Sequence, residues 1–84
     1  MPVKIHIREK ETKKGIPFIM VRLEKEGRLY ADDTDAHGWA EFDNVRDGKY
    51  IVKVRSPNHR PFTEKMYISN HSLITDIKLS RAYD

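Results

Sequence analysis

The chain has 84 residues, with 16 Lys or Arg, 13 Asp or Glu and no cysteine. This length allows a single domain over residues 1–84 and no second hydrophobic core. The lack of cysteine excludes disulfides and thiolate metal sites, and no segment approaches the roughly 20 apolar residues of a membrane span. Charges of both signs are interspersed, whereas nucleic-acid-binding proteins tend to segregate their basic residues. We therefore expect neither a membrane nor a nucleic acid as a partner.

The amino-terminal residues contain no apolar run of signal-peptide length. Together with the absence of cysteine, this favours a cytoplasmic location if the chain is complete. If the chain is instead part of a longer surface protein, we expect an extracellular location.

Short runs in which apolar and polar side chains alternate, separated by turn residues, recur along the chain. This spacing is typical of β-sandwiches, and no helical apolar spacing persists for more than about ten residues. The alternation predicts strands at residues 3–7, 17–24, 28–34, 39–43, 49–55, 62–69 and 73–79.

The alternation also predicts which side chains of these strands face the core. In the third strand two choices arise: either Leu29 and Ala31 or Tyr30 and Asp32 point inward. Because burial of Asp32 would be unfavourable, we expect Leu29 and Ala31 inside. We expect Arg81 and the residues after it to fray. The other inward positions are expected to be Val3, Ile5, Ile7, Ile19, Val21, Leu23, Ala40, Phe42, Tyr50, Val52, Val54, Leu73, Thr75, Ile77 and Leu79, with Val45 added from a loop.

Three segments resemble the transthyretin-like (prealbumin-like) sandwich, closest to the carboxypeptidase regulatory-like domains and their relatives among bacterial surface repeats. They are Gly15-Ile16-Pro17, Thr34-Asp35-Ala36-His37-Gly38 and Gly48-Lys49-Tyr50-Ile51-Val52. The resemblance implies an all-β, Greek-key sandwich of about seven antiparallel strands, with the second and fifth strands adjacent in one sheet and the fourth in the other. It also implies use as an accessory, adhesive or interaction module, and no particular reaction.

Bacterial surface relatives of this kind carry an isopeptide crosslink between an inward Lys and an inward Asn or Asp. Here Lys4 and Asp76 have the parity opposite to their apolar neighbours, so both are expected to face solvent. We therefore expect no crosslink.

The acidic segment Asp32-Asp33-Thr34-Asp35-Ala36-His37-Gly38 has a superficial likeness to a calcium loop. The EF-hand pattern requires a bidentate Glu at a fixed spacing and a helix on each side, and Glu41 does not satisfy that spacing. The four histidines show no ligand pairing either. We expect a structural turn, with no metal and no cofactor.

The 5-hydroxyisourate hydrolases share the implied fold and carry a catalytic His on the first strand, which His6 loosely resembles. The Arg that those enzymes have after the turn glycine is Trp39 here, and their C-terminal Tyr-Arg-Gly-Ser is replaced by Arg81-Ala82-Tyr83-Asp84. No orienting partner for His6 and no oxyanion donor can be recognised in the sequence. We expect no catalytic residue and no enzyme activity.

Phe18, Met20 and Ile51 have outward parity on strands that the resemblance makes neighbours, and Trp39 points outward on the other sheet. Such an apolar surface marks a partner site. We expect a non-catalytic module for protein–protein interaction or structural assembly that docks a partner or a second copy of itself. The alternative is a carbohydrate-binding accessory domain, whose stacking residues would be Trp39, Tyr30 and Tyr67 on one exposed face. The third reading is the hydrolase.

Overall fold

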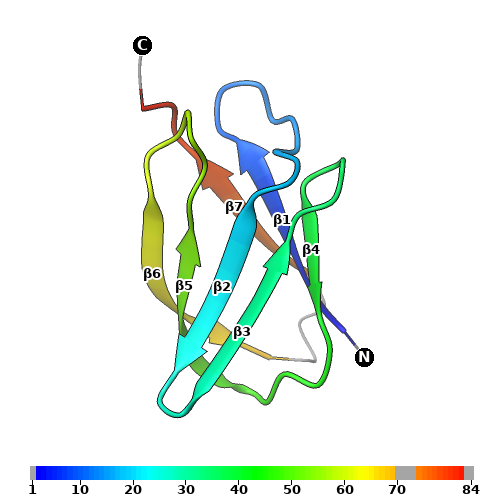
Figure 1. The fold of residues 1–84 in the computed structure, drawn as a ribbon, viewed down its shortest axis with the longest axis vertical. Helices are drawn as coiled ribbons and strands as arrows, with labels where there is room; N and C mark the ends of the chain where they lie inside the picture. Colours follow the sequence, from blue (N-terminus) through cyan, green and yellow to red (C-terminus); the bar gives the residue numbers. More distant parts are fainter. Residues whose placement is uncertain (1, 70–73, 83–84) are drawn as a thin grey trace.

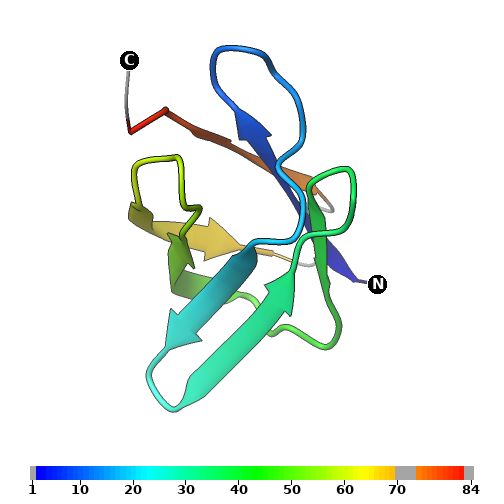
Figure 2. The same ribbon diagram turned by 45° about the horizontal axis from the view of Figure 1, so that its top comes forward.

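The structure is a computed structural model that describes residues 2–69 and 74–82. Its strands form two sheets that pack face to face, with the orders β4-β1-β7 and β3-β2-β5-β6 (Figures 1 and 2). The prediction of an all-β sandwich of seven strands is confirmed. In the described residues no helix is long or apolar enough to cross a membrane. The strands are β1 (Val3–Glu9), β2 (Met20–Lys25), β3 (Arg28–Asp33), β4 (Trp39–Phe42), β5 (Gly48–Val54), β6 (Phe62–Ile68) and β7 (Ile74–Leu79).

The four-stranded sheet is antiparallel throughout, but the three-stranded sheet is mixed. Strands β1 and β7 pair in parallel, with Ile7 beside Ile77. The prediction of a purely antiparallel sandwich is therefore wrong at this pair. The first and last strands are not joined by a hairpin, so no turn imposes an antiparallel direction on them.

The core lies between the two sheets and contains the inward residues expected of β1, β2, β4 and β5, together with Ile77 and Leu79 of β7. The two-residue period of a strand places these side chains on one face, and each sheet buries that face against the other. Leu73 lies outside the described residues, and Thr75 is half-buried. The core consists of Val3, Ile5, Ile7, Ile16, Ile19, Val21, Leu23, Ala40, Phe42, Val45, Tyr50, Val52, Val54, Ile68, Ile77 and Leu79.

The predicted orientation of β3 is wrong. Tyr30 packs against the core with its ring edge toward Tyr50, at a centroid distance of 6.0 Å, whereas Leu29 is 58% exposed and Ala31 is also exposed. The expected penalty for burying Asp32 does not arise, because this side chain is exposed near the end of an edge strand. Its carboxylate accepts a hydrogen bond from the backbone N–H of Glu41 at 3.0 Å.

Strand β2 begins at Met20, later than expected, because the chain turns at Phe18. Phe18 has a φ of 55°, in the left-handed region that a bulky residue seldom adopts. This turn lets Ile16 and Ile19 both reach the core although they are three positions apart, which a continuous strand would not allow.

The residues after β7 do not fray where expected. Arg81 forms an antiparallel bridge with His59, and the N–H of Ala82 donates to the carbonyl of Asn58 at 3.1 Å. The prediction of fraying is therefore wrong for Arg81 and Ala82, and the last two residues lie outside the described part. Backbone hydrogen bonds to the β5–β6 corner hold this segment in place.

Candidate functional site

Two glycines bring the β3–β4 turn against the loop that follows β1. A Cβ on Gly15 would collide with the carbonyl of His37, and a Cβ on Gly38 would collide with the carbonyl of Ile7. Gly38 also has a φ of 88°, and its carbonyl accepts a hydrogen bond from the N–H of Ile7 at 2.8 Å. Glycine at both positions therefore lets the turn approach β1 closely.

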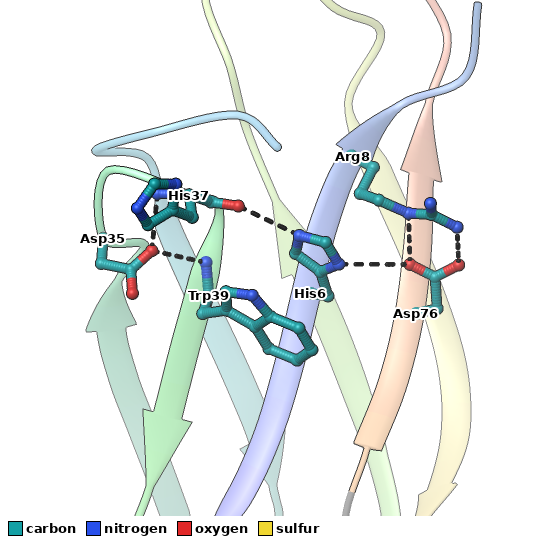
Figure 3. Close-up of polar contacts among 6 residues, drawn as sticks. All are labelled: His6, Arg8, Asp35, His37, Trp39 and Asp76. Atoms are coloured by element: carbon teal, nitrogen blue, oxygen red, sulfur yellow. Dashed lines mark hydrogen bonds and ion pairs between the residues drawn. The ribbon is translucent and has the colours of Figure 1, made fainter. Parts of the chain in front are cut away.

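The side chain of Asp35 stabilises the same turn by hydrogen bonds to the turn's own backbone. Its Oδ1 accepts hydrogen bonds from the backbone N–H of His37 at 2.8 Å and of Trp39 at 3.0 Å (Figure 3). These bonds lower the pKa of the Asp35 carboxyl, and the bond from Trp39 has the larger effect of the two. The described residues contain no group of three or more His, Cys, Asp or Glu side chains placed to hold a metal ion.

The turn places the carbonyl of His37 beside the ring of His6 on β1 (Figure 3). Nε2 of His6 lies 3.0 Å from this carbonyl oxygen, and a carbonyl only accepts, so Nε2 is the donor. The ring stacks on the indole of Trp39, with centroids 4.0 Å apart and planes at 2°. Nδ1 lies 4.0 Å from a carboxylate oxygen of Asp76.

The expectation that His6 has no orienting partner is therefore wrong. Its contacts come from β4, from the β3–β4 turn and from β7, all distant in sequence. No local spacing could have indicated them. Both ring nitrogens are directed at protein groups and one ring face is covered, which holds the imidazole in a single orientation.

Asp76 is held by Arg8, which donates from Nε at 2.9 Å and from a terminal nitrogen at 2.6 Å (Figure 3). This bidentate contact lowers the pKa of the Asp76 carboxyl. Lys4 is exposed on the same outer face. The predicted outward parity of Lys4 and Asp76 is confirmed, and neither side chain faces the core.

A second polar cluster, which no local sequence pattern predicted, joins the end of β1 to the corner after β5. His59, only 8% exposed, has Nε2 at 2.9 Å from Glu9 and Nδ1 at 2.9 Å from the hydroxyl of Ser56. Arg81 donates to the other Glu9 oxygen at 2.8 Å. The hydrogen bonds from Arg81 and then His59 lower the pKa of Glu9 to about 2. Charged residues separated by 50 and 72 positions gave no local signal of this cluster.

The outer face of the four-stranded sheet is the second candidate surface. Phe18, Met20 and Ile51 are exposed as predicted, and β2 and β5 are neighbours. The three do not gather in one patch, however. In the register Ile51 lies opposite Glu24, and Arg22 and Lys53 lie between Ile51 and Met20.

The same face carries two exposed apolar residues that were not anticipated there, Leu29 and Tyr67. Leu29 was missed because the orientation of β3 was wrong. Trp39, predicted to be part of an interaction surface, is half-buried beneath His6 on the other sheet.

The rings proposed for sugar stacking do not share a surface. Tyr30 packs against the core, Tyr67 is exposed on the four-stranded sheet, and Trp39 lies on the outer side of the three-stranded sheet. A sugar-binding platform requires aromatic faces on one exposed surface. The arrangement removes the observation on which the carbohydrate alternative was based.

Comparison with known protein-family models and with curated proteins gives no match for this chain.

Proposed function

We propose that the protein is a non-catalytic, transthyretin-like Greek-key sandwich that serves as a protein-interaction or structural module. Support for the fold assignment comes from the strand order: β2 and β5 are neighbours in one sheet and β4 lies in the other, as the sequence resemblance implies. The docking surface is the outer face of the four-stranded sheet.

One observation carries this proposal. All five large apolar side chains that are exposed in the described part of the chain belong to the four-stranded sheet or to the residues leading into it. They are Phe18, Met20, Leu29, Ile51 and Tyr67, with exposed fractions from 39% for Ile51 to 74% for Phe18. Single exposed apolar residues are normal on a protein, but here all five belong to one sheet or to the residues leading into it, which supports a partner site there.

Phe18 adds a second argument. Its left-handed backbone conformation costs about 1–2 kcal/mol for a residue with a side chain, and its ring is exposed. The Phe18 ring does not pack in the core, and glycine at this position would avoid the backbone strain. The stability of the fold therefore does not explain why this residue is phenylalanine. Strain of this kind is typical of positions kept for function.

The contacts of His6 argue against the hydrolase alternative. A general base needs a nitrogen within reach of the substrate. Nε2 of His6 is instead engaged by the carbonyl of His37, and Nδ1 faces Asp76. These contacts favour a structural role that ties β1, β4 and β7 together.

Site-specific photo-crosslinking tests the proposed function. A benzophenone amino acid at Ile51, on the outer face of the four-stranded sheet, should give discrete adducts in the native cells. Tyr67→Lys in the same protein should abolish them. The control position is Glu41, which is exposed on the outer face of the other sheet. Equal crosslinking from both positions, or none from position 51, would refute this docking surface.

A further inference from the structure

We propose that the outer face of the four-stranded sheet binds an acidic protein segment that also carries apolar side chains. This inference rests on the proposed function and names the class of partner. It follows from how the register arranges lysines and apolar residues on β5 and β6.

On the outer face of β5 and β6, lysines and apolar residues lie next to one another both along the strands and across them. Ile51 lies opposite Lys65, and Lys49 lies opposite Tyr67. Along β5 the outward residues Lys49, Ile51 and Lys53 alternate in the same way, and on β6 Lys65 lies next to Tyr67 and is followed by Thr63 on its other side. Outward residues on one strand are about 6.6–6.8 Å apart and neighbouring strands are about 4.8 Å apart. Each apolar side chain therefore has a lysine beside it both along and across the sheet.

The charge of the whole face is positive. Its outward strand positions include four cationic residues, Arg22, Lys49, Lys53 and Lys65, against two acidic ones, Glu24 and Asp33. Arg22 and Lys53 each approach Glu24 at 3.4 Å. The salt bridges between described residues involve neither Lys49 nor Lys65. These two lysines are the ones that flank Ile51 and Tyr67.

Three kinds of partner could cover this face: a second copy of the chain, a single-stranded nucleic acid or an acidic protein segment. The charge and the exposed side chains of the face favour the last. A second copy docked face to face would bring this excess of cations against itself, which is unfavourable. A single-stranded nucleic acid would require several stacking rings. On the outer strand positions of β5 and β6 the described residues offer one exposed ring, that of Tyr67, and the other exposed aromatic side chain, Phe18, precedes β2. An acidic segment with apolar side chains matches both the lysines and the exposed Ile51 and Leu29.

The test uses short synthetic peptides and the intact chain. The probe peptide contains Glu with Leu at every third position. One control peptide replaces Glu by Lys and the other replaces Leu by Ser. Binding is measured by titration of the labelled protein with NMR detection. We expect the Glu–Leu peptide alone to bind, with amide shifts in β5 and β6 and none in β1 or β4. Because exposed charges are screened over about 10 Å at 0.1 M salt, its affinity should fall as salt is raised.

Charge reversal makes the test specific. The double variant Lys49→Glu/Lys65→Glu should bind the Glu–Leu peptide at least about tenfold more weakly and should gain binding of the Lys–Leu peptide. The matched control, Lys4→Glu/Lys78→Glu on the other sheet, should bind like the wild type. If the charge-reversed variant does not fold, Lys49→Gln/Lys65→Gln should still weaken the Glu–Leu complex.

Each contrary result has a defined meaning. Equal binding of the Lys–Leu and Glu–Leu peptides would overturn the acidic partner while leaving the docking surface intact. Tighter binding of an oligothymidylate than of the Glu–Leu peptide would overturn the assignment to protein. Failure of every apolar peptide would overturn this inference, and crosslinking from position 51 would then decide separately whether the proposed function also fails.

Discussion

Thr34 and Ile19 are joined by two hydrogen bonds. The hydroxyl of Thr34 accepts from the N–H of Ile19 at 3.0 Å, and the N–H of Thr34 donates to the carbonyl of Ile19 at 2.8 Å. The same hydroxyl donates to the carbonyl of Ile16 at 2.8 Å. Thr34 is buried, so it satisfies the polar backbone of the turn that places Ile16 and Ile19 in the core.

Thr34→Val should therefore lower the free energy of unfolding by about 2–3 kcal/mol, because a buried N–H and a buried carbonyl lose their partner. Thr34→Ser retains the hydroxyl and should lose much less. Urea unfolding of the three proteins measures the difference. Equal losses in the Val and Ser variants would contradict the argument, because the hydroxyl would then contribute no more than the methyl group.

Phe18→Gly should be more stable than Phe18→Ala by about 1 kcal/mol, because glycine adopts the left-handed conformation without a steric penalty. Both variants lose the same exposed ring, so thermal unfolding of the pair isolates the backbone term. Both should also lose partner docking if the ring belongs to the proposed surface. A glycine variant that is the less stable of the two would contradict the strain argument.

Gly38→Ala should destabilise the protein more than Gly27→Ala. Both glycines have positive φ, 88° and 75°, so both substitutions introduce strain of about 1 kcal/mol. A Cβ at Gly27 meets nothing, whereas one at Gly38 collides with the backbone of Ile7 and Gly15. The difference between the two losses in denaturant unfolding measures the close approach. Equal losses of unfolding free energy in the two variants would mean that the β3–β4 turn can move away from β1 with little loss of stability.

The stability contributed by Glu9 should depend on pH in the acid range. Its pKa is lowered to about 2 in the folded protein from an ordinary value of 4.5. A carboxyl group whose pKa is lowered by folding stabilises the folded state at pH values above its pKa in the unfolded chain. This contribution is lost as the pH falls from about 4.5 to about 2. Glu9→Gln should therefore be less stable than the wild type at pH 6, and the difference should shrink as the pH approaches 2.

Glu26→Gln, in the exposed β2–β3 turn, serves as the control and should show no such narrowing. Thermal melts of the three proteins between pH 6 and pH 2 make the comparison. A wild-type advantage over Glu9→Gln that persists unchanged at pH 2 would contradict the assignment of this stability to the ionised carboxylate of Glu9.

The intact mass of the protein should equal the mass calculated from its sequence. Lys4 and Asp76 both lie on the outer face of the three-stranded sheet, and Asp76 is paired with Arg8. Neither is shielded from water as isopeptide formation requires in the proposed relatives. Electrospray mass spectrometry of the purified protein measures this directly. A deficit of one water or one ammonia would show that a crosslink forms despite the outward parity.

The alternation of apolar residues was sufficient to predict the sandwich and the inward faces of β1, β2, β4, β5 and β7. It was insufficient for β3, an edge strand with both apolar and polar residues at either parity. There Tyr30 faces inward and its ring packs against Tyr50, two strands away on the inner face of the same sheet, a contact that no property of β3 alone reveals. The late start of β2 was also missed, since it depends on Thr34, fifteen positions away from Ile19.

The sequence by itself determined the class of fold, because a strand turns successive side chains to opposite faces and burial selects one of them. It also determined that Phe18, Met20 and Ile51 would be exposed. The tertiary structure alone decided that His6 stacks on Trp39, that Glu9 binds His59 and Arg81, and that lysines surround Ile51 and Tyr67. These contacts join residues from different strands, and strand register, which no local pattern specifies fully, brings them together.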